Sequence, residues 1–144
     1  MVRVNSVNPA YGDDGSEANM VPLVQEFFHS RGIETFLQEV FPGRHNVIAR
    51  LPGRTTRKLV LEAHTDTVSI KGMTQPPFDP FIEGGRMHGR GSVDDKAGLA
   101  AMMHAMASVK EDGIVPPCEV WLAAVVDATF RLGRVGTTVG FHRR

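Results

Sequence analysis

Two short segments of this chain carry residue types that can bind metal ions. The first, His64–Val68, places an imidazole and a carboxylate two residues apart, directly after an apolar run. The second, Gly89–Lys96, places the adjacent carboxylates of Asp94 and Asp95 after a glycine-rich approach. Histidine nitrogens and carboxylate oxygens are natural zinc ligands. A carboxylate that gives one oxygen to each of two metals would create a centre that polarises a carbonyl and lowers the pKa of a bound water.

The spacing also suggests how the histidine is oriented. Asp66 follows His64 by two residues, and residues i and i+2 of an extended segment point to the same face. The Asp66 carboxylate could therefore reach the imidazole and fix its tautomer. Structural roles also fit: a hydrogen-bonded histidine at a strand end, and a helix cap at Asp94–Asp95 with a favourable first-turn charge. Spacing alone leaves both interpretations open and slightly favours the structural one.

The hydrophobic pattern predicts the elements that must position these residues. Helices are expected from Ser16 or Asn19 to about Arg31 and from Asp95 to about Lys110, and strands over Asn46–Leu51, Lys58–Ala63 and Glu119–Val126. The apolar run Leu59–Leu61 favours a central strand buried on both faces, and Gly84–Gly85 predicts a hairpin turn. The expected fold is α/β, a partial mixed β-sheet flanked by helices.

The predicted order of strand, helix and strand forms a βαβ unit, and ligands gather at the carboxyl ends of strands in such sheets. His64 and Asp66 follow one strand, while Asp127 follows another. Asp94 opens the intervening helix. These residues could therefore face one crevice.

Composition excludes several partner classes. The 144 residues include sixteen basic and sixteen acidic side chains, giving a net charge of zero, and no block of like charge stands out. Nucleic acid and membranes are therefore not expected partners. Cys118 is the only cysteine, which excludes a disulfide within the chain and fits a reducing compartment. The start of the chain has no apolar signal core, so the expected location is the cytoplasm.

Four ordered stretches resemble the zinc-dependent amidohydrolase and metallopeptidase family of acetylornithine deacetylase, succinyl-diaminopimelate desuccinylase, aminoacylase and glutamate carboxypeptidase. They are Asn46–Arg50, Leu59–Val68, Pro77–Pro80 and Gly89–Gly98. The resemblance runs from about Val7 to Phe130, and the tail 131–144 is unmatched. It implies that residues 1–144 form the N-terminal part of that family's catalytic domain, as one truncated domain.

The resemblance implies a role for each candidate residue. His64 would bind one zinc or cobalt ion, and Asp66 would serve catalysis by orienting His64. Asp94 would bridge two metal ions and precede a strained peptide bond to Asp95. The implied reaction is metal-dependent hydrolysis of the amide bond in small N-acyl amino acids or peptides.

The resemblance breaks directly after the last predicted strand. There the family has an aspartate followed by two glutamates, the first a general base and the second a metal ligand. This chain has Asp127, Ala128 and Thr129 instead. Alanine has no proton acceptor and threonine is a poor zinc ligand, so the general base and the next ligand are expected to be missing.

The number of ligands then bounds the activity. A catalytic zinc usually has three protein ligands, whereas this chain offers His64 and Asp94, with Asp127 as a speculative third. The family supplies its remaining ligands later, and nothing around His142 matches its distal histidine. The chain alone is therefore expected to have little or no hydrolase activity.

Two alternatives to a hydrolase stay open: a non-catalytic scaffold or interaction module that retains the fold, and an artificially truncated gene model. In the absence of later strands, Glu119–Val126 is expected to leave an unpaired apolar edge, which favours homodimers or aggregation. His88 and His104 are expected to be structural, and the methionine cluster near the second helix is expected to pack in the core.

Overall fold

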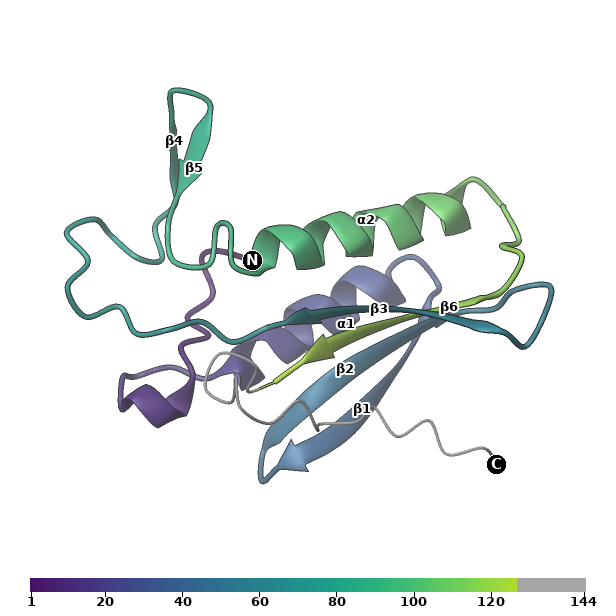
Figure 1. The fold of residues 1–144 in the computed structure, drawn as a ribbon, viewed down its shortest axis with the longest axis horizontal. Coiled ribbons are helices and arrows are strands. Elements are labelled where there is room, and N and C mark those ends of the chain that lie inside the picture. Colours follow the sequence, from purple (N-terminus) through teal and green to yellow (C-terminus); the bar gives the residue numbers. More distant parts are fainter. Residues whose placement is uncertain (127–144) are drawn as a thin grey trace.

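The computed structural model describes residues 1–126. Two helices, α1 (Val21–His29) and α2 (Lys96–Glu111), pack on a four-stranded sheet whose order is β1 (Glu34–Phe41), β2 (Arg44–Leu51), β6 (Glu119–Val125) and β3 (Lys58–His64). The short helices η1 (Pro9–Tyr11) and η2 (Glu17–Met20) precede α1, and a separate hairpin of β4 (Phe81–Glu83) and β5 (Arg86–His88) extends away from the sheet (Figure 1). The predicted α/β class and the hairpin are confirmed.

The predicted βαβ unit is confirmed as well. β3 and β6 are parallel neighbours connected through α2, and their register places His64 beside Val125 at the carboxyl ends of both strands. β2 pairs with β6 on its other side in the antiparallel sense. The end of β3 that carries His64 therefore lies at the edge of the sheet where βαβ proteins bind ligands.

Two expectations about the sheet edges are wrong. β6 is not an edge strand, because β2 and β3 flank it on both sides. Within residues 1–126, β3 is the edge strand instead of a central one, and Leu59 and Val60 are 49% and 41% exposed. An apolar run describes a strand's own side chains, whereas its place in the sheet depends on long-range pairing. The run Leu59–Leu61 therefore could not distinguish a central strand from an apolar edge.

The helix boundaries also differ slightly from prediction. Ser16 caps η2, not α1, and its Oγ accepts a hydrogen bond from the Ala18 N–H at 3.1 Å. α1 then begins at Val21 with Pro22 in its first turn, where the missing N–H costs no intrahelical bond. It ends at His29, two residues earlier than expected. α2 begins at Lys96, directly after Asp95 as its N-cap residue.

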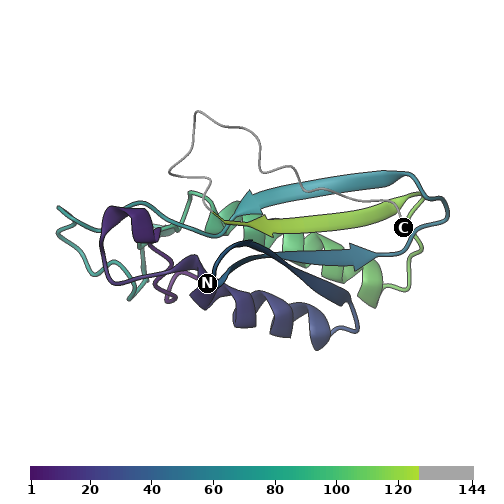
Figure 2. The same ribbon diagram turned by 90° about the horizontal axis from the view of Figure 1, so that it is seen from below.

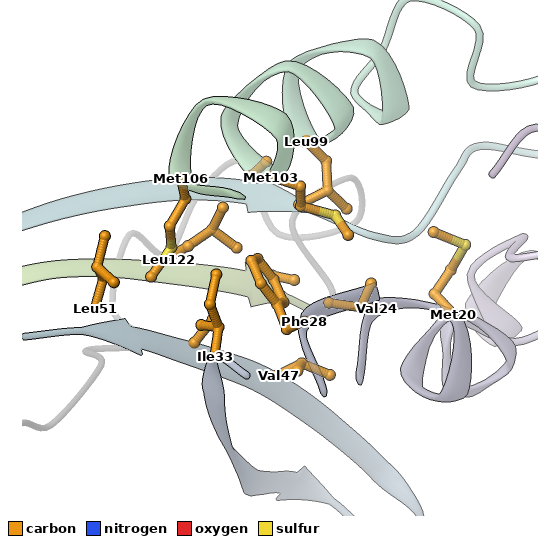
Figure 3. Packing of buried hydrophobic residues seen from close by; sticks show 13 residues of the cluster. Met20, Val24, Phe28, Ile33, Val47, Leu51, Leu99, Met103, Met106 and Leu122 are labelled. Atoms are coloured by element: carbon orange, nitrogen blue, oxygen red, sulfur yellow. The ribbon is translucent and has the colours of Figure 1, made fainter. Parts of the chain in front are cut away.

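Both helices cover the same face of the sheet (Figure 2), and their apolar side chains fill the space between the two layers. Phe28 of α1 lies among residues from the sheet and α2 (Figure 3), and its side chain is fully buried. Leu99, Met103 and Met106 of α2 are at most 2% exposed, which confirms the expected core packing of the methionines. Burying one such side chain stabilises a fold by about 1.5–3 kcal/mol. In the described part of the chain, no helix has both the length and the apolar composition needed to cross a membrane.

Candidate metal centre

His64 is the last residue of β3, and hydrogen bonds continue past it to the end of β6. The Thr65 N–H donates to the carbonyl oxygen of Val125 at 2.8 Å, and the Thr65 hydroxyl donates to the same oxygen at 3.1 Å. The chain therefore keeps its place beside β6 for one residue after the strand. This pairing holds His64, whose side chain is 16% exposed, at the carboxyl end of the sheet.

Asp66 lies on the Nδ1 side of the imidazole. Its main-chain carbonyl oxygen is 2.9 Å from His64 Nδ1, and its carboxylate Oδ1 is 3.4 Å from the same nitrogen. Both atoms are acceptors, so Nδ1 carries a proton and Nε2 is the ring nitrogen that faces Asp94. The predicted contact between Asp66 and His64 is present, although the carbonyl is nearer than the carboxylate. Asp66 itself is fully buried.

Asp94 lies on the other side of the ring. Its Oδ1 is 2.9 Å from His64 Nε2, and its side chain is 78% exposed. The structure therefore brings together the two residues that the sequence predicted as metal ligands. The carboxylate of Asp66, its main-chain carbonyl and the carboxylate of Asp94 raise the pKa of His64 to about 9, although burial opposes this shift.

The loop before α2 brings Asp94 to this position, and glycines allow it to pass close to other segments. Gly91 has φ of 80°, and a Cβ there would lie 2.9 Å from Thr67 Cγ2 and 3.0 Å from Lys96 Cδ. The buried Lys96 donates from Nζ to the carbonyl oxygen of Val4 at 2.7 Å, which ties the start of α2 to the N-terminal segment. Burial lowers the pKa of this lysine to about 8. The peptide bond between Asp94 and Asp95 is cis.

Two buried polar residues beside Asp66 were missed by the sequence analysis. Asn8 donates from Nδ2 to Asp66 Oδ2 at 2.8 Å. Glu17 is fully buried and accepts a hydrogen bond on Oε1 from Arg44 Nε at 2.8 Å; burial raises the pKa of this carboxyl. No spacing rule marks Asn8 or Glu17, because both come from the N-terminal segment, and only the tertiary fold brings Asn8 into contact with Asp66.

The other candidates are separate from this centre or cannot be placed. His88 stacks on Phe81 with ring centroids 4.8 Å apart, and His104 packs edge-on against Phe27 at 5.0 Å. These contacts agree with the structural roles expected for both histidines. The positions named after the last strand, Asp127, Ala128, Thr129 and His142, lie outside the described residues.

The donor set fits part of a zinc site. His64 Nε2 faces a solvent-exposed carboxylate oxygen of Asp94, and imidazole nitrogens and carboxylate oxygens are both zinc ligands once the Nε2 proton has been lost. Asp66 stands on the protonated side of the ring, where metal-binding histidines commonly have a carboxylate or carbonyl partner. Among residues 1–126, no group of three or more His, Cys, Asp or Glu side chains gathers as a metal site would require. The described residues therefore offer two candidate ligands, His64 and Asp94.

Comparisons with known proteins identify the relatives of this chain. Residues 60–127 match Peptidase family M20/M25/M40. A peptidase M20 domain-containing protein of Schizosaccharomyces pombe is 36% identical over 116 residues, which cover 78% of this chain and 27% of the relative. Succinyl-diaminopimelate desuccinylase of Gluconobacter oxydans is 35% identical over 117 residues, covering 78% of this chain and 29% of that enzyme.

One solved structure shares the fold of this chain. The crystal structure of an M20 family metallo-carboxypeptidase from Sulfolobus solfataricus superposes with a TM-score of 0.73 at 20% identity, over 86% of this chain and 28% of that one. The chain thus spans less than a third of the length of each of these relatives.

Proposed function

This chain belongs to Peptidase family M20/M25/M40, and on that premise we propose that it supplies part of a two-metal centre that hydrolyses amide bonds. The substrates would be small N-acyl amino acids or peptides, and the metal zinc or cobalt. The observation that carries this proposal is the 2.9 Å approach of His64 Nε2 to Asp94 Oδ1 at the carboxyl end of β3. The desuccinylase of Gluconobacter oxydans, whose name specifies a succinyl amide, supports the substrate class.

Each residue has a distinct task in this proposal. His64 would hold one metal through Nε2, while Asp66 keeps the proton on Nδ1 and fixes the ring. Asp94 would bridge the two metals through its exposed carboxylate. The metals, when bound, would polarise the substrate carbonyl and acidify a water molecule. The protein contributes the orientation of the ligands before metal arrives.

We further propose that the 144-residue chain has little or no hydrolase activity by itself. Ala128 stands where the family resemblance expects the general base, and such a base contributes roughly 10²–10⁴-fold in rate. Thr129 stands where a carboxylate ligand is expected. The assay is zinc-supported release of acetate or succinate from N-acetyl and N-succinyl amino acids by the purified chain. Turnover close to that of a full-length relative would disprove this inactivity, and Ala128→Glu with Thr129→Glu is expected to restore none.

The metal proposal is tested separately by isothermal titration of zinc into the chain. Zinc uptake is expected in the unchanged chain and is expected to be lost in His64→Ala and Asp94→Asn. His104→Ala is the matched control, because this histidine packs against Phe27 and lies outside the candidate centre. A folded chain that binds no zinc would refute the metal proposal and support the alternative, a non-catalytic scaffold.

We also propose that copies of the chain associate through the edge of β3. Antiparallel pairing about a two-fold axis at Val60 would place Lys58 of one copy opposite Glu62 of the other and Leu59 opposite Leu61. Opposite charges and apolar pairs across strands both favour such pairing. Sedimentation should show a dimer that Val60→Lys disrupts, whereas Ile82→Lys, on the separate hairpin, should not. A monomer at high concentration would refute this association.

A further inference from the structure

The N-terminal segment runs alongside the chain that follows His64. The Thr67 N–H donates to the carbonyl oxygen of Ser6 at 2.9 Å, and the Asn8 N–H donates to the carbonyl oxygen of Thr67 at 2.9 Å. Val7 and Thr67 form a parallel bridge between these two bonds. Residues 6–8 are therefore fixed beside residues 65–67, and this register brings the side chain of Asn8 to the carboxylate of Asp66.

The amide of Asn8 has a fixed orientation. Its Oδ1 accepts a hydrogen bond from the Ala10 N–H at 3.0 Å, which caps η1. Its Nδ2 donates to Asp66 Oδ2 at 2.8 Å, and both side chains are fully buried. A flipped amide would place two acceptors against each other and a donor against a donor. The two ends of this side chain therefore perform separate tasks, one in the local turn and one at Asp66.

This hydrogen bond determines which oxygen of Asp66 faces the histidine. With Oδ2 held by Asn8, Oδ1 is the carboxylate atom that lies 3.4 Å from His64 Nδ1. Rotation of the Asp66 carboxylate would break the bond to Asn8, so Asn8 resists that rotation.

We propose that Asn8 is a positioning residue of the metal centre, acting on His64 through Asp66. Its amide fixes the side chain of Asp66, the residue whose carbonyl oxygen and Oδ1 lie 2.9 Å and 3.4 Å from His64 Nδ1, and so helps to keep Nε2 directed at Asp94. This inference rests on the proposed metal-binding function of His64 and Asp94. It adds a residue 58 positions away from Asp66 that no metal-ligand spacing would indicate.

Two substitutions separate the tasks of Asn8. Asn8→Ser keeps an oxygen that can cap η1 but is too short to reach Asp66. Asn8→Asp keeps the capping oxygen and replaces the donor facing Asp66 by a second carboxylate. Ser16→Ala is the matched control: it removes the cap of η2, where Ser16 accepts from the Ala18 N–H, and it does not touch Asp66. All variants are compared with the unchanged chain and with His64→Ala.

The test is a cobalt titration followed by visible absorbance, together with urea unfolding of each metal-free variant. Loss of the partner of a ligand-orienting group typically lowers metal affinity by about 10–100-fold, and we expect that loss in Asn8→Ser and Asn8→Asp. Ser16→Ala should unfold more easily yet bind cobalt as the unchanged chain does. This difference distinguishes positioning from stability.

The outcomes also separate this proposal from the one it rests on. If His64→Ala abolishes cobalt binding while both Asn8 variants bind normally, the positioning role is wrong and the metal centre stands. If an equally destabilised Ser16→Ala loses the same affinity, the effect is structural and the positioning role is again wrong. If the unchanged chain takes up no cobalt, the proposed centre is wrong and the role of Asn8 falls with it.

Discussion

The loop between β2 and β3 crosses the chain that enters β6, and Gly53 is its point of closest approach. A Cβ at this position would lie 2.1 Å from both the carbonyl carbon and oxygen of Cys118 and 2.6 Å from the nitrogen of Glu119. All three are backbone atoms. The Glu119 N–H is itself held by the carbonyl oxygen of Arg57 at 2.8 Å. Gly53→Ala therefore cannot be accommodated by rotation of a side chain.

The expected loss follows from two opposing effects. Overpacking typically costs about 1–3 kcal/mol, and the rigid neighbours of Gly53 place this change at the upper end, about 3 kcal/mol. Replacing glycine by alanine also restricts the unfolded chain, which stabilises the fold by about 0.4–1 kcal/mol. The net loss in the free energy of unfolding is therefore about 2–2.6 kcal/mol.

Urea unfolding followed by the fluorescence of Trp121, the only tryptophan, measures this loss. Gly113→Ala is the control: Gly113 has φ of 67°, and a Cβ there would meet no atom within 4 Å. That change should cost only the left-handed backbone penalty, about 1–2 kcal/mol, less the same gain from the unfolded chain. A Gly53→Ala loss no larger than that of Gly113→Ala would refute the close approach of the loop to β6.

Two further predictions concern pH and the core. Burial raises the pKa of Glu17 above its ordinary 4.5. The protonated carboxyl therefore stabilises the fold below about pH 4.5, and this stabilisation is lost as the pH rises through the raised pKa of the folded state. Glu17→Gln should remove this slope, which is at most about 1.4 kcal/mol per pH unit, in urea titrations between about pH 4 and pH 7. Phe28→Ala should cost about 3–5 kcal/mol, and Phe36→Ala, at a position 42% exposed, less than half as much; equal losses would contradict the core assignment.

The elements with a clear period were predictable from the sequence. α2 shows apolar residues at helical spacing, and the hairpin between Phe81 and His88 has two glycines at its turn, so both were predicted close to their observed bounds. β1, Glu34–Phe41, was missed. Its observed burial does not alternate between faces, because it lies at the edge of the sheet and pairs only with β2 among the described residues. The order of the strands in the sheet could not be predicted either, because paired strands are far apart in the sequence.

The contacts of the candidate centre were also predictable from the sequence only in part. The approach of His64 to Asp94 was predictable, because a strand end and the start of the following helix meet at one edge of a βαβ unit. The contact between Asn8 and Asp66 was not, since it joins a loop residue to a residue 58 positions later through a bridge of only one residue pair. Short-range spacing in the sequence can indicate candidate ligands. The residues that position those ligands can lie anywhere in the sequence, because only the tertiary fold brings them together.

The packing of the secondary-structure elements sets the relative positions of His64 and Asp94. The β3–β6 pairing ends at His64 and Val125, and the core contacts of Leu99 and Met103 fix α2 against these strands. Asp94, two residues before α2, follows the position of that helix. A shift of α2 along the sheet would thus separate Asp94 from His64 without touching either residue. By this reasoning, the packing of α2 affects the geometry of the candidate centre as well as the stability of the fold.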